Sequence, residues 1–138
     1  MLIEQIASVQ VLDQAFAWVC DSRAHYHFNG DIWHQWRWWH QKKNQIQGLI
    51  RSGRYRFREL RQIRAIDRIF EWWHSQDALV LKAISIVLTA HLLPHLSPRC
   101  FHLAGTGGIK GAVRDVLAHL WENKFVFRTD VQRLICQY

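Results

Sequence analysis

Apolar residues recur at helical spacing in the first part of the chain. An amphipathic helix is predicted over residues 2–22, and a second one over residues 32–50, after a break and candidate N-cap at 29–31. The apolar stripe of the first helix consists of Leu2, Ile6, Val9, Phe16 and Val19. That of the second consists of Ile32, Trp36, Trp39, Ile46 and Ile50. Trp33 and Trp38 lie off this stripe, where they would be partly exposed.

The segment after Gly53 changes to a period of two. Cations alternate with aromatic residues from Arg54 to Arg58, which is typical of a strand. Arg54, Arg56 and Arg58 should therefore project from one face of that strand. Such a row of guanidinium groups suits a phosphate backbone, because each group binds phosphate oxygens bidentately.

Two more short strands are indicated at Arg61–Ile66 and Arg68–Trp73, with Asp67 near the turn. A basic β-hairpin is the prediction for this region. A helix from Glu59 to Trp73 would fit the same residues.

The second half of the chain is predicted to hold two helices and a strand. Residues 78–88 are apolar nearly all round, which indicates a central helix, and Pro94 ends the apolar run. An amphipathic helix follows a glycine-rich loop and covers residues 109–120. Phe125–Val131 is typical of a buried strand that carries a carboxylate, Asp130. The expected fold class is therefore α+β, mainly helical.

Composition and charge favour nucleic acid as the partner. The 138 residues carry a formal net charge of +7 and include eight tryptophans. Cations neutralise phosphates and flat rings stack on unpaired bases, so RNA or DNA binding is favoured. The alternative is that the tryptophans form the core and the arginines a solvated face.

The sequence gives little support for disulfides, a metal site or a membrane span. The three cysteines are too few and too scattered for a disulfide framework. His25 with His27, or Cys100 with His102, could supply two metal ligands, but neither has a second pair at zinc-site spacing. The apolar run that ends at Leu93 is too short to span a bilayer. A signal peptide is not expected, because Glu4 falls inside what would have to be its apolar core and no basic region comes before that core. A cytoplasmic chain without a membrane partner is expected.

Arginines are concentrated in the predicted hairpin. Seven lie between residues 51 and 68, against only two carboxylates. The candidate nucleic-acid or nucleotide ligands there are Arg54, Arg56, Arg58, Arg61 and Arg64. The alternative is a solubilising edge strand, although lysine would serve that purpose equally well. Lys110 and Arg114 lie four residues apart at a predicted helix N-terminus, where an anion is favoured, and are added as candidates.

The order of features resembles bacterial reverse transcriptases of the group II intron and retron-like kind. Asp77–Ala83 resembles the helix that joins fingers to palm, and Phe125–Val131 resembles the palm motif whose aspartate binds magnesium. The other similar segments are Trp36–Trp39, Gly53–Phe57, Ser97–His102 and Gly107–Arg114. The resemblance implies N-terminal helices and a fingers-like basic hairpin over residues 1–74. It implies the start of the palm over residues 75–138.

The departures from the family imply a truncated, inactive polymerase. In the complete enzyme Asp130 would hold Mg²⁺ and act in catalysis, but the chain lacks the paired-aspartate motif and ends at Tyr138. Two-metal phosphoryl transfer needs carboxylates around ions about 4 Å apart, which one aspartate cannot supply. Tight magnesium binding is not expected, and a missing palm and thumb polypeptide is a possible partner. The alternatives are a small standalone basic nucleic-acid-binding protein and a tryptophan-rich protein-interaction module.

Overall fold

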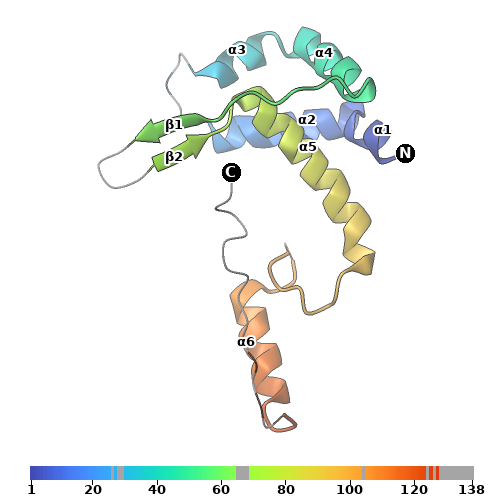
Figure 1. Ribbon diagram of the computed structural model, residues 1–138, viewed down its shortest axis with the longest axis vertical. Coiled ribbons are helices and arrows are strands. Elements are labelled where there is room, and N and C mark those ends of the chain that lie inside the picture. Colours follow the sequence, from blue (N-terminus) through green and yellow to red (C-terminus); the bar gives the residue numbers. More distant parts are fainter. Residues whose placement is uncertain are drawn as a thin grey trace. The chain divides into compact units, whose positions relative to one another are not determined.

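The fold is taken from a computed structural model that describes residues 1–25, 27, 30–64, 69–103, 105–123, 125 and 127. The chain divides into two compact units, Met1–Pro94 and His95–Tyr138. The first unit consists mostly of helices and one antiparallel pair of strands (Figure 1). The expected class, α+β and mainly helical, is confirmed.

The elements follow one another in a simple order. They are α1 (Leu2–Ile6), α2 (Val9–Ser22), α3 (Asp31–Arg37), α4 (Trp39–Arg51), β1 (Arg61–Arg64), β2 (Ile69–Trp72), α5 (Ser75–Leu92), the 3-10 helix η1 (Leu93–His95) and α6 (Gly108–His119).

The helix predicted over residues 2–22 is two helices. Ser8 interrupts it with an extended backbone, φ −69° and ψ 146°, and its hydroxyl accepts a hydrogen bond from the Val11 N–H at 3.3 Å. Ser8 is therefore the N-cap of α2, a role that serine fills well because its oxygen satisfies a free N–H. Because the apolar stripe continues across Ser8, the spacing of apolar residues does not reveal the break.

The helix predicted over residues 32–50 is also broken, at Trp38, with φ −111° and ψ 23°. Because α4 restarts the helix there, Trp36 does not face the core as predicted and is 62% exposed. Trp39 does pack inward. Its ring stacks on Phe16 at 4.0 Å between centroids, and its Nε1 donates to Asp13 Oδ1 at 2.8 Å.

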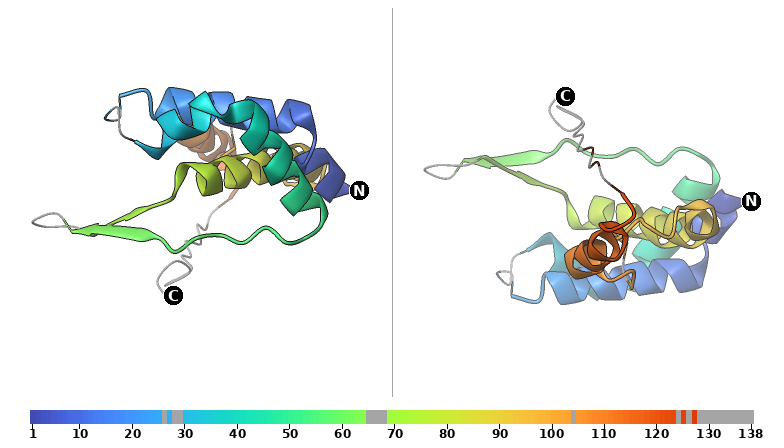
Figure 2. Two further views of the ribbon diagram at one scale, coloured as in Figure 1. Left: turned by 90° about the horizontal axis from the view of Figure 1, so that it is seen from above. Right: turned by 90° about the horizontal axis from the view of Figure 1, so that it is seen from below.

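The core of the first unit lies between α5 and the N-terminal helices. α5 packs against α1, α2 and α3 (Figures 1 and 2). Fully buried apolar side chains come from α2, α3, α4 and α5, among them Leu12, Val19, Ile32, Ile46, Leu79 and Ala83. The prediction of a central third helix is confirmed.

The predicted hairpin is present and projects away from the helices (Figure 2, left). β1 and β2 are antiparallel, with Arg61 opposite Trp72 and Arg64 opposite Ile69. Arg54–Arg58 does not join them as a strand. Its backbone bonds elsewhere, because the Arg54 and Tyr55 N–H groups donate to Leu49 O at 3.0 and 3.1 Å. The extended segment is therefore attached to the end of α4 and not to a neighbouring strand.

α5 is longer than its apolar run suggests. Together with η1 it forms a helical stretch of 21 residues, which is long and apolar enough by length and composition to cross a membrane. This corrects the prediction that the run is too short. Core helices of water-soluble proteins meet the same criterion, and α5 begins with two buried polar residues, Ser75 and Asp77. In the structure 22% of this stretch is buried, and the buried residues of α5, from Ser75 to Val87, pack in the core of the first unit.

The second unit contains α6, which confirms the predicted fourth helix. Gly107 precedes it with φ +91°, a left-handed conformation that favours glycine. Phe125 and Phe127 are 91% and 90% exposed and lie in no strand, so the predicted buried strand is wrong at these two positions. No strand pairs with them among the described residues. The boundary between the compact units follows Pro94, because α5 packs on the N-terminal helices. The division into a fingers-like part, 1–74, and the start of a palm, 75–138, stays a prediction.

Candidate nucleic-acid interface

The five candidate arginines of residues 54–64 are all exposed. They are Arg54, Arg56, Arg58, Arg61 and Arg64. None of them forms an ion pair with a carboxylate within the described ranges. Basic residues elsewhere do form such pairs, at Arg23–Asp31, Lys43–Asp13, Arg51–Glu4 and Arg99–Asp115. Positive charge in residues 54–64 is thus left available to an external anion.

Two contacts with Asp77 hold this segment on the helical core. Tyr55 Oη donates to Asp77 Oδ1 at 2.6 Å, and the Arg58 N–H donates to Asp77 Oδ2 at 3.2 Å. Burial and the hydrogen bond to the carboxylate both raise the pKa of the Tyr55 hydroxyl, so it stays a donor at neutral pH. The side chains of Arg54, Arg56 and Arg58 therefore project from a backbone that is held in place.

A second polar cluster surrounds the first residue of α5. Asp31 Oδ2 and Oδ1 accept hydrogen bonds from the N–H and hydroxyl of Ser75, each at 2.6 Å. Arg23 is 8% exposed, donates to Ser75 Oγ and to Trp73 O, and lies 3.7 Å from Asp31. The hydrogen bonds and charges outweigh the effect of burial and lower the pKa of the Asp31 carboxyl. Asp31, which the sequence predicted as a cap of its own helix, supports α5 instead.

His74 cannot satisfy all the donors around it. Its Nδ1 lies 3.3 Å from the Gln76 N–H and its Nε2 lies 2.6 Å from Arg58 Nη1. Burial lowers the pKa of the imidazole, and a neutral imidazole has a single acceptor nitrogen. Asp31 Oδ2, 3.5 Å from Nε2, favours the tautomer with the proton on Nε2. The 2.6 Å contact with Arg58 Nη1 favours the other tautomer, in which Nε2 accepts, so the neutral ring can accept from Arg58 or from the Gln76 N–H but not from both.

A pocket of about 370 Å³ opens beside this cluster. Its wall includes Gln35 and Trp38 from the α3–α4 region, Lys42 from α4, and Arg58 and His74. Gln35 is 6% exposed, and neither its Oε1 nor its Nε2 has a hydrogen-bond partner. We name this hollow the Gln35 pocket. It combines two cations, an exposed indole and an unsatisfied amide.

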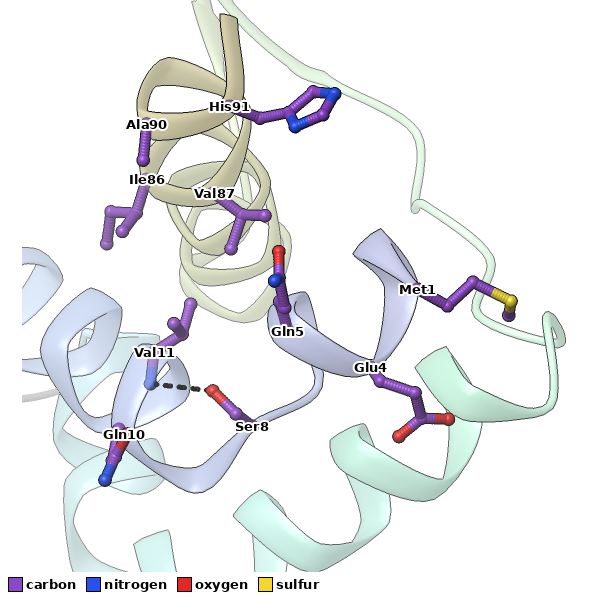
Figure 3. A pocket seen from close by; sticks show the side chains of 10 residues that line it. All are labelled: Met1, Glu4, Gln5, Ser8, Gln10, Val11, Ile86, Val87, Ala90 and His91. Atoms are coloured by element: carbon purple, nitrogen blue, oxygen red, sulfur yellow. Dashed lines mark hydrogen bonds between the residues drawn. The ribbon is translucent and has the colours of Figure 1, made fainter. Parts of the chain in front are cut away.

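A larger hollow, about 680 Å³, lies between α1–α2 and the C-terminal half of α5 (Figure 3). Ser8 and Val11 lie on one side and Ile86 and Val87 on the other, with His91 at one end. Its lining includes one carboxylate, Glu4, which is paired with Arg51, and one imidazole, His91. The candidate interface is therefore the arginine segment with the Gln35 pocket.

The remaining predicted residues lie elsewhere. Lys110 and Arg114 are exposed on α6, one turn apart, and Arg114 Nε donates to Lys110 O at 3.3 Å. Asp130, the predicted catalytic and magnesium-binding residue, lies outside the described residues. Within the part of the chain that the structure describes, no three histidine, cysteine or carboxylate side chains are grouped as a metal site would require.

Sequence analysis missed Arg23, Asp31, His74 and Gln35 as members of one site. They lie far apart in the chain, and the contact between Asp31 and Ser75 joins positions 44 residues apart. Comparison with known proteins finds no matching family model and no matching curated protein.

Proposed function

We propose that this chain binds RNA or DNA through the phosphate backbone, using the arginines of residues 54–64. The observation that carries the proposal is that the five arginines of residues 54–64 are exposed and lack carboxylate partners among the described residues. A solubilising surface does not need unpaired arginines in such density. Phosphate contacts do, since each guanidinium can bind two phosphate oxygens.

The resemblance to bacterial reverse transcriptases supports a polymerase context for this binding. In that context the arginine segment belongs to the fingers, and Asp130 is one of several carboxylates that hold Mg²⁺. The activity proposed for this chain is nucleic-acid binding, and synthesis would require further carboxylates around the two ions.

The test is a salt titration of binding to a fluorescein-labelled oligo(dT), followed by anisotropy. Phosphate binding should weaken steeply between about 50 and 200 mM salt. Replacing Arg54, Arg56 and Arg61 together by alanine should lower the slope of log K against log salt by about 0.7 for each phosphate that is no longer neutralised. Arg51→Ala is the matched control, because Arg51 is already paired with Glu4 at 3.1 Å.

Binding that does not change over this range of salt, or a triple variant with the slope of the wild type, would refute the proposal. The tryptophan-rich interaction module would then be the better interpretation, since apolar docking survives high salt.

A further inference from the structure

The unsatisfied amide of Gln35 requires a partner with both a donor and an acceptor. A buried amide that makes no hydrogen bond carries a large desolvation cost, so native proteins rarely retain one. Gln35 lines the pocket, and its two amide atoms lie buried behind the pocket wall without partners, so a base reaches them only when the wall side chains shift. A phosphate offers only acceptors. The edge of a nucleobase offers an adjacent donor and acceptor, which is the pair that a glutamine amide matches.

The other walls of the pocket suit the rest of a nucleotide. Trp38 is 51% exposed and offers a face on which an unpaired base can stack. Arg58 and Lys42 supply positive charge, and Arg58 is exposed beside His74. Asp31 also lines the pocket, but Ser75, Arg23 and His74 already engage its carboxylate.

We propose that the Gln35 pocket holds one unpaired nucleotide of a bound single strand. Its base lies against Trp38 and Gln35, and its phosphate lies near Arg58 and Lys42. The volume of about 370 Å³ is near the lower end of the range of about 300–1,000 Å³ for ligand pockets. This inference rests on the proposed function, because the arginine segment would deliver the strand to the pocket.

The experiment separates the base from the backbone. Affinity of the full chain is measured for oligo(dA) and for an abasic strand with the same number of phosphates. The wild type should bind oligo(dA) about tenfold more tightly, as expected for one stacked base. Gln35→Met, which removes both polar atoms, should reduce this preference several-fold and leave the abasic affinity unchanged.

Trp38→Ala gives a second test that does not alter a buried side chain. It should remove most of the preference for oligo(dA). Trp36→Ala is the matched control, since Trp36 is 62% exposed on the adjoining turn and does not line the pocket. It should leave both affinities unchanged.

The outcomes distinguish the two proposals. Tight binding of the abasic strand with no preference for oligo(dA) overturns the pocket proposal and leaves phosphate binding in place. The pocket proposal is also overturned if Gln35→Met lowers the affinity for both strands equally and Trp38→Ala behaves like Trp36→Ala. Gln35 would then have only a structural role. Failure to bind either strand overturns both proposals.

Discussion

Asp31→Ala should destabilise the first unit more than the same change at a carboxylate that makes no buried contacts. The change removes both hydrogen bonds to Ser75, each 2.6 Å long, and takes a negative charge from beside Arg23. It leaves the N–H at the start of α5 and a buried guanidinium less well satisfied. α5 is the central helix, so the loss affects the whole unit.

The magnitude follows from the two hydrogen bonds. A hydrogen bond to a charged group contributes about 1.5–3 kcal/mol. The Asp31 side chain is 29% exposed, so water replaces part of each bond and the lower end applies. The expected loss is about 3 kcal/mol for the two bonds together. With a urea slope of about 2 kcal/mol per molar, the unfolding midpoint should fall by about 1.5 M.

Urea unfolding followed by tryptophan fluorescence and by circular dichroism measures this shift. Asp21→Ala is the control, because Asp21 is exposed on α2 and lies outside the polar cluster; its effect should stay within about 0.5 kcal/mol. If Asp31→Ala shifts the midpoint no more than Asp21→Ala, the assigned support of α5 by Asp31 is wrong.

Four further effects are expected in the same assay. Tyr55→Phe removes the hydroxyl that donates to the buried Asp77 carboxylate at 2.6 Å and should cost about 1.5–3 kcal/mol; a neutral result would contradict the attachment of the arginine segment. Ser8→Ala removes the cap of α2 and should cost about 0.5–2 kcal/mol, whereas an unchanged midpoint would mean that the break needs no cap. Burial lowers the pKa of His74 in the folded state, so the free energy of unfolding should fall as the pH drops below about 6.5 and through that lowered pKa. The pKa of Asp31 is also lowered, so a further loss of stability is expected below about pH 3.9. A profile that is flat from neutral pH to about pH 3 would refute both assignments.

The order of apolar and polar residues was enough to predict α5, α6 and the hairpin. The apolar run before Pro94 indicated α5, the spacing of residues 109–120 indicated α6, and two short runs on either side of Asp67 indicated a hairpin. Each signal lies within one element or one pair of neighbouring strands, so it does not need the rest of the fold. The high density of arginine was likewise visible from composition alone.

Only tertiary structure decided how these elements meet. The breaks at Ser8 and Trp38 interrupt continuous apolar stripes, so periodicity could not reveal them. Asp31 is the first residue of its own helix, yet its carboxylate bonds to Ser75, because packing brings α3 to the start of α5. The burial of Gln35 and its lack of partners depend on that same packing. A sequence records which groups can bond, but the distances between remote groups arise only when the chain is folded.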